Sequence, residues 1–185
     1  GVALLVLMVI VTTAVSLAQL HRQVEIRIAV TTQSLAKSID QTFNGLIDTI
    51  DVMLLASSSE ITHLMALGTA DRETVSAMLA GQKQHIPYTA NLRATDAEGD
   101  IRFGEDVTSP PLSIADREHF LRLYDNPDNG LAINKPFVGR ITGKWVWTFS
   151  RPIRRRDGSF AGVVFATVNL SEIDKILASI KIDPG

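Results

Sequence analysis

The chain has 185 residues, of which 45% are hydrophobic, with 18 basic and 20 acidic side chains and no cysteine. This length suits one domain with its own core plus an additional segment. The net charge of −2 gives no reason to propose nucleic acid as a partner, because phosphate binding requires a basic excess, and the lack of cysteine excludes disulfides and thiolate sites.

A concentrated apolar segment opens the chain and accounts for its high mean hydropathy of +0.15. Residues 1–20 contain no charged side chain, and twenty helical residues span roughly 30 Å, about the hydrocarbon thickness of a bilayer. The alternatives are a buried core helix and a signal peptide, which has a shorter apolar stretch that ends in a cleavage motif. We predict a transmembrane helix over residues 1–20.

Residues 21–58 are predicted to form a long amphipathic stalk helix. Apolar side chains recur every three or four positions, for example at Ile39, Phe43, Leu46 and Ile50, which is the spacing of one helical stripe. The remaining residues cannot cover a helix of this length, so part of the stripe is expected to meet the same helix of a second chain in a homodimer. The alternative is that the stripe packs entirely on its own domain.

Residues 59–179 are predicted to fold as an α+β domain. One helix is expected over residues 69–80, with Thr69 or Asp71 as its N-cap. Capping-box patterns predict two more helices, which open at Ser113 and Ser171. About five antiparallel strands are expected from alternating and β-branched segments, over residues 91–96, 101–103, 131–137, 144–154 and 160–170.

No catalytic arrangement stands out in this domain. The four histidines are far apart in the sequence, and none has a metal-ligand partner at helical spacing. No G-x-S-x-G motif occurs, and residues 139–144 depart from a phosphate loop in their glycine spacing. We expect no catalytic, metal or cofactor site in this segment.

Several short motifs follow one another in the second half of the chain. They are DREHF at 116–120, GR at 139–140, TGKW at 142–145, SR at 150–151 and DGSFAGVV at 157–164. In this order they resemble the double-Cache (PDC, PAS-like) extracytoplasmic sensor domains of bacterial signalling proteins. The two preceding helices also fit the layout of that family, so the resemblance covers nearly the whole chain.

The resemblance implies that the chain is part of a receptor in the bacterial inner membrane, with the residues after about 20 in the periplasm. Residues 59–179 would be the membrane-distal sensor module, and residues 180–185 the start of a proximal module. A second membrane helix and a cytoplasmic diguanylate cyclase, histidine kinase or chemoreceptor signalling region would follow. The alternative is a membrane-tethered structural module that only dimerises and binds no ligand.

The resemblance also implies a small-molecule pocket between the sheet and the helix and loops that cover it. By position, the candidate ligand-binding residues are Arg117, Phe120, Arg140, Trp145, Trp147, Arg151 and Asn169. An arginine fork suits a carboxylate, and tryptophan supplies an amphipathic wall. The alternative for Trp147 and Phe149, which share one strand face, is that they pack the core.

One position limits the choice of ligand. Amino-acid-binding members of the family carry a late-strand aspartate that holds the ligand amine, whereas this sequence has Asn169 at the comparable place. An asparagine cannot supply the negative charge that an ammonium group requires. The expected ligand is therefore a small carboxylate or another anion.

Overall fold

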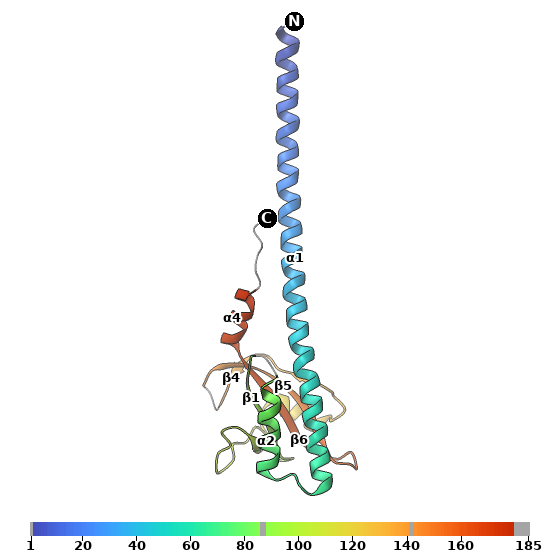
Figure 1. Cartoon of the computed structure of the whole chain (residues 1–185), viewed down its shortest axis with the longest axis vertical. Helices are drawn as coiled ribbons and strands as arrows, with labels where there is room; N and C mark the ends of the chain where they lie inside the picture. Colours follow the sequence, from blue (N-terminus) through green and yellow to red (C-terminus); the bar gives the residue numbers. More distant parts are fainter. Residues whose placement is uncertain (1, 86–87, 141–142, 180–185) are drawn as a thin grey trace. The chain divides into compact units, whose positions relative to one another are not determined.

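The computed structural model describes the backbone of residues 2–85, 88–140 and 143–179. The chain divides into two units, residues 1–43 with 180–185 and residues 44–179. In the first unit the chain is helical from Val2 onwards (Figure 1). The predicted start of a proximal module at residues 180–185 lies outside the described part of the chain.

The first helix, α1, runs without interruption from Val2 to Leu67. Its segment Ala36–Leu67 is long and apolar enough to cross a membrane, but a core helix meets the same criteria. Ile50 and Leu54 of this segment are fully buried in the core of the second unit, while 22% of its apolar window as a whole is buried.

Residues 44–179 fold as an α+β unit around one antiparallel sheet, which confirms the predicted fold class. The strand order is β2-β1-β6-β5-β3, and β4 pairs with β5 outside this path. The strands are β1 (Thr89–Thr95), β2 (Ile101–Gly104), β3 (Ala132–Ile133), β4 (Phe137–Val138), β5 (Trp145–Arg154) and β6 (Phe160–Asn169).

The strand predicted over residues 131–137 is divided into β3 and β4. Asn134, Lys135 and Pro136 separate the two. Pro136 has no N–H to donate to a ladder, whereas the N–H of Asn134 still donates to the carbonyl of Thr148 at 3.1 Å. The division places the Asn134 side chain in the protein interior, where it is 7% exposed.

Three further helices belong to this unit. α2 (Arg72–Lys83) has Asp71 as its N-cap, with the carboxylate accepting from the N–H of Thr74 at 2.8 Å. This confirms one of the two predicted caps. The other helices are α3 (Glu118–Asp125) and α4 (Leu170–Ser179).

Both capping-box predictions were wrong about where the helix begins. Ser113 forms a bridge with Asp100 of the β1–β2 turn, and its hydroxyl accepts from the N–H of Ala115 at 3.3 Å. Pairing with the hairpin thus holds this segment out of the helix, and α3 begins at Glu118. Ser171 lies inside α4, because that helix follows β6 directly.

The sheet separates two hydrophobic cores. Successive strand residues point to opposite faces, and β6 is buried continuously from Ala161 to Val168. One core packs α1 and α2 against residues such as Phe149 and Val164. The other packs α3 and the segment before it against residues such as Phe165.

Gly162 in β6 is required by the close approach of β1. Its φ is +142°, and a Cβ at this position would overlap the carbonyl oxygen of Thr95. We expect Gly162→Ala to lower the free energy of unfolding by about 3 kcal/mol, because backbone strain and overpacking add. Chemical denaturation measures this.

The control is Gly81→Ala in α2, where a Cβ would meet no atom within 4 Å. Alanine is favoured over glycine in a helix by about 1 kcal/mol, so this variant should be slightly more stable than the wild type. Equal denaturation midpoints for the two variants would contradict the role assigned to Gly162.

Candidate ligand-binding site

A small cavity of about 50 Å³ lies on the face of the sheet that carries α3. A water molecule needs about 10–15 Å³, so the enclosed part of the cavity has room for only a few heavy atoms. The sheet contributes Asn91, Arg93, Ile101, Val146, Thr148, Phe165 and Thr167. The covering segments contribute Leu112, Ile114, Arg117, His119, Phe137, Gly139 and Arg140.

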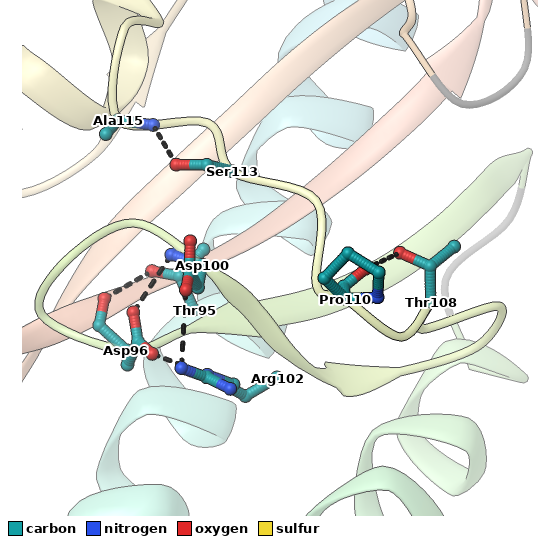
Figure 2. A network of polar contacts seen from close by, with 8 residues as sticks. All are labelled: Thr95, Asp96, Asp100, Arg102, Thr108, Pro110, Ser113 and Ala115. Atoms are coloured by element: carbon teal, nitrogen blue, oxygen red, sulfur yellow. Dashed lines mark hydrogen bonds and ion pairs between the residues drawn. The ribbon is translucent and has the colours of Figure 1, made fainter.

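The segment that covers the cavity is fastened to the β1–β2 hairpin. The N–H of Ile114 donates to the carbonyl of Gly99 at 2.8 Å, and the N–H of Ile101 donates to the carbonyl of Leu112 at 3.0 Å. Arg102 stabilises the turn of this hairpin (Figure 2). Its guanidinium lies 2.6 Å from a carboxylate oxygen of Asp96 and 3.3 Å from one of Asp100. Leu112 and Ile114 therefore line a wall of fixed position.

Arg117 is the N-cap residue of α3, but its side chain does not cap the helix. Its guanidinium carbon lies 5.2 Å from the centre of the Phe137 ring, within the range of a cation–π contact. In the part of the chain that the structure describes, the guanidinium makes no hydrogen bond and no ion pair. Its five N–H donors are therefore open to a ligand.

The other two arginines of the cavity are already paired. Arg140 donates to the Asp116 carboxylate at 2.7 Å and to the Ser113 carbonyl at 3.1 Å, and this contact holds the pKa of Asp116 below its ordinary value. Arg93 is 2% exposed and donates to the carbonyl of Glu105 at 2.8 Å. Both therefore have part of their donor capacity taken up within the protein.

His119 is 2% exposed and lies in the first turn of α3. Its Nδ1 is 3.2 Å from the Nδ2 atom of Asn134, and its ring is stacked 5.9 Å from that of Phe137. Burial, with a smaller contribution from the positive charge of Arg117, lowers the pKa of His119 to about 4. The ring is therefore uncharged at neutral pH.

Three buried polar atoms in the cavity have no hydrogen-bond partner among the described residues. They are Nε2 of His119 and the hydroxyl oxygens of Thr148 and Thr167. Buried polar atoms are almost always paired, and each unpaired one costs about 1–3 kcal/mol. A bound polar ligand would supply the missing partners.

Of the predicted site residues, the structure brings Arg117 and Arg140 to the cavity. Phe120 is 3% exposed and packs in the neighbouring core, with its ring 5.7 Å from that of Phe160. Asn169 pairs with Val146 and so lies on the cavity face of the sheet, but it does not line the cavity.

The remaining three candidates lie away from the cavity. Trp145 is 57% exposed. Trp147 contacts Phe149 with ring centres 4.7 Å apart and packs against the core that contains α1, which is the alternative described for these residues. Arg151 binds Asp51 of α1 at 2.6 and 2.9 Å.

Sequence reasoning missed His119, Thr148 and Thr167. His119 stands inside the DREHF motif, but a histidine at one position carries no signal of burial. The two threonines are ordinary β-formers in the sequence, and only the register of β5 and β6 places them opposite each other. The alternation that put Trp147 on one face of β5 also predicts Thr148 on the other.

The described part of the chain thus combines an antiparallel sheet, backed by α1 and α2, with a small and mostly apolar cavity on its other face. The family model described as Cache domain (dCache_1) matches residues 16–185. The chain therefore belongs to the Cache domain family, which comprises extracellular sensor domains of signal-transduction receptors. A comparison with curated proteins gave no match.

Solved structures show the same fold. The extracellular domain of rpHK1S-Z16, described as a histidine kinase, has a TM-score of 0.72 at 24% identity, over 82% of this chain and 61% of that one. The Campylobacter jejuni chemoreceptor Tlp3 with L-valine has a TM-score of 0.63 at 15% identity, over 79% of this chain and 61% of that one. The Pseudomonas aeruginosa amino acid chemoreceptor PctC with GABA has a TM-score of 0.63 at 15% identity, over 78% of this chain and 65% of that one. The chain thus spans less than two thirds of each of these relatives.

The lowered pKa of His119 predicts how stability depends on pH. The unfolded chain binds a proton at His119 as the pH falls below about 6.5, whereas the folded chain does so only near 4, so stability is lost over this interval. Between pH 7 and pH 5 the free energy of unfolding should fall by about 2 kcal/mol at this residue. Urea denaturation at several pH values measures the change.

His119→Phe keeps an aromatic ring but removes the titrating group, so this variant should lack that part of the pH dependence. Its control is His63→Phe, which changes an exposed histidine of α1. The assignment fails if His119→Phe loses as much stability between pH 7 and pH 5 as the wild type.

Proposed function

We propose that this chain is the extracytoplasmic ligand-sensing region of a bacterial membrane receptor and that its cavity binds a small carboxylate or another small anion. The observation that carries the proposal is the guanidinium of Arg117, which contacts the Phe137 ring but makes no hydrogen bond or ion pair with the described residues, in a cavity whose described lining has no acidic side chain. The expected membrane anchor over residues 1–20 and a cytoplasmic output domain belong to the same proposal.

The charge of the cavity argues against an α-amino acid as the ligand. The relatives Tlp3 and PctC were solved with L-valine and GABA, both of which carry an amine. No described lining residue of the cavity is acidic. Asn169, which stands where the family resemblance places an aspartate, is uncharged and lies on the same face of the sheet but outside the cavity. An ammonium group would lose its hydration without gaining a counter-charge, which is unfavourable.

Strand β5 offers a route from the cavity to α1. Thr148 of this strand lines the cavity, while Trp147 and Phe149 on its other face pack against the core that contains Leu54. Three residues further on, Arg151 donates two hydrogen bonds to the carboxylate of Asp51 in α1. Ligand contacts that shift β5 would thus bias the position of α1, which is how binding at one site changes another.

The prediction for ligand binding concerns Arg117. A small anion that binds the cavity should raise the melting temperature of the 185-residue chain in detergent micelles by about 5–10 °C at a hundredfold excess over Kd. In Arg117→Ala this stabilisation should disappear, because the carboxylate loses its counter-charge. Differential scanning fluorimetry with sodium salts of small organic acids, sulfate and phosphate, at matched ionic strength, measures the shift.

Arg156→Ala is the charge-matched control, because Arg156 is exposed and does not line the cavity. It should retain the ligand shift. If no anion stabilises the wild type, or if Arg117→Ala responds like the wild type, the structural-module alternative becomes the better explanation.

The proposed receptor is a homodimer through α1. Val52 and Leu55 are 63% and 50% exposed on this helix, and their spacing of three residues places them on one stripe. We expect the chain in micelles to be dimeric and the double variant Val52→Glu with Leu55→Glu to be monomeric, because paired glutamates repel. Light scattering after size-exclusion chromatography measures the mass.

Leu121→Glu is the control for this experiment, because Leu121 is 43% exposed on α3 rather than on α1. It should leave the dimer intact. A wild-type chain that stays monomeric at high concentration would contradict pairing through α1.

A further inference from the structure

His119 lines the cavity and has one buried ring nitrogen that makes no hydrogen bond within the described structure. The ring is held between two aromatic rings, those of Phe137 at 5.9 Å and Phe165 at 5.8 Å. Its Nε2 is buried and has no partner among the described residues. The ring therefore cannot turn away to satisfy this atom elsewhere.

Asn134 determines which ring nitrogen carries the proton. The Nδ2 atom of its amide lies 3.2 Å from Nδ1 of His119, and the N–H of Asn134 is itself held by the Thr148 carbonyl. An amide nitrogen can only donate, so Nδ1 must accept. A neutral ring then carries its single proton at Nε2. A lining residue of the cavity thus carries an N–H donor that the described residues leave unused.

The donor is neutral rather than cationic. The charged groups that act on His119 are Arg117 and Asp116, both in the turn before α3, and burial with the Arg117 charge lowers the pKa of the ring to about 4. The residues that face it from β4 and β6, Phe137 and Phe165, are uncharged. Above pH 5 the ring is therefore a neutral donor, which selects a hydrogen-bond acceptor by its position along the N–H bond and not by its charge.

Two threonines of the sheet also line the cavity. Thr148 and Thr167 are directly opposite each other in the β5–β6 pair, both line the cavity, and neither hydroxyl has a partner in the described structure. A threonine hydroxyl both donates and accepts. This pair therefore suits a hydroxyl or keto oxygen rather than a methyl group.

We infer that the cavity takes a short hydroxy- or oxo-carboxylate, whose carboxylate is bound by Arg117 and the Nε2–H of His119 and whose second oxygen is bound by Thr148 and Thr167. This inference rests on the proposed function and adds the chemical class of the ligand. The cavity volume of about 50 Å³ limits such a ligand to a few heavy atoms.

The first test needs no ligand. Nitrogen-15 NMR of the 185-residue chain with labelled histidine, in detergent micelles at pH 7, reports the tautomer of His119. We expect the proton at Nε2 in the wild type and a mixture of tautomers in Asn134→Leu. A proton at Nδ1 in the wild type would overturn the assignment of His119 as a donor, whatever the cavity binds.

The second test uses sodium glycolate, with sodium acetate as the probe that lacks the second oxygen. Calorimetric titration should give at least tenfold tighter binding of glycolate, and Thr148→Val should remove that preference, since one good hydrogen bond is worth about a factor of ten. His119→Phe should weaken glycolate at least tenfold, whereas His119→Gln, which keeps an N–H donor, should stay within about threefold of the wild type.

The outcomes separate this inference from the proposed function. Equal affinity for acetate and glycolate, or wild-type affinity in His119→Phe, overturns the inference. So does the absence of binding by either probe. In each case, stabilisation by another anion that is lost in Arg117→Ala leaves the proposed function intact.

Discussion

The burial of β6 on both faces is the constraint on which the rest of the structure depends. A strand buried from Ala161 to Val168 needs a hydrophobic cover on each side of the sheet. α1 and α2 cover one side, and α3 with the segment before it covers the other. The close fit at Gly162 fixes how β6 lies against β1, and the cavity forms where the second cover does not fill the space above β5 and β6.

This arrangement gives β5 two roles at once. Its cavity face carries Val146 and Thr148, and its helix face carries Trp147, Phe149 and Arg151. Strands in the middle of a sheet are held on both edges by hydrogen bonds, so their residues do not move independently. Alternation thus connects the cavity to a helix on the far side of the sheet without any dedicated linking segment.

Much of the fold could be predicted from the sequence, because the signals were local. The strands at 144–154 and 160–170, the cap at Asp71 and the α+β class follow from propensity and periodicity. The predicted start of α3 was wrong, because Ser113 and Ile114 bond to the hairpin at Asp100 and Gly99, which lies outside the sequence pattern that predicts a cap. A local pattern at Ser113 cannot show that competition.

The site was predicted only in part, for a related reason. Arg117 and Arg140 were found through short motifs, and the alternation correctly grouped Trp147 with Phe149. Alternation does not say which face of β5 meets α1, however, since β6 beside it is apolar on both faces. The contact between Asn134 and His119 could not be predicted, because Asn134 lies in the break between β3 and β4, where the sequence pattern indicated one continuous strand.

The ion pair between Arg140 and Asp116 has a consequence for the wall of the cavity. Arg140 lines the cavity, yet both side chains are largely open to solvent, with 42% and 61% exposed. Such a pair adds little stability, and exposed side chains change rotamer within nanoseconds. The side chain of Arg140 can therefore rearrange more readily than Leu112 and Ile114, whose backbone is bonded to the β1–β2 hairpin, so one part of the cavity wall is adjustable while another is held.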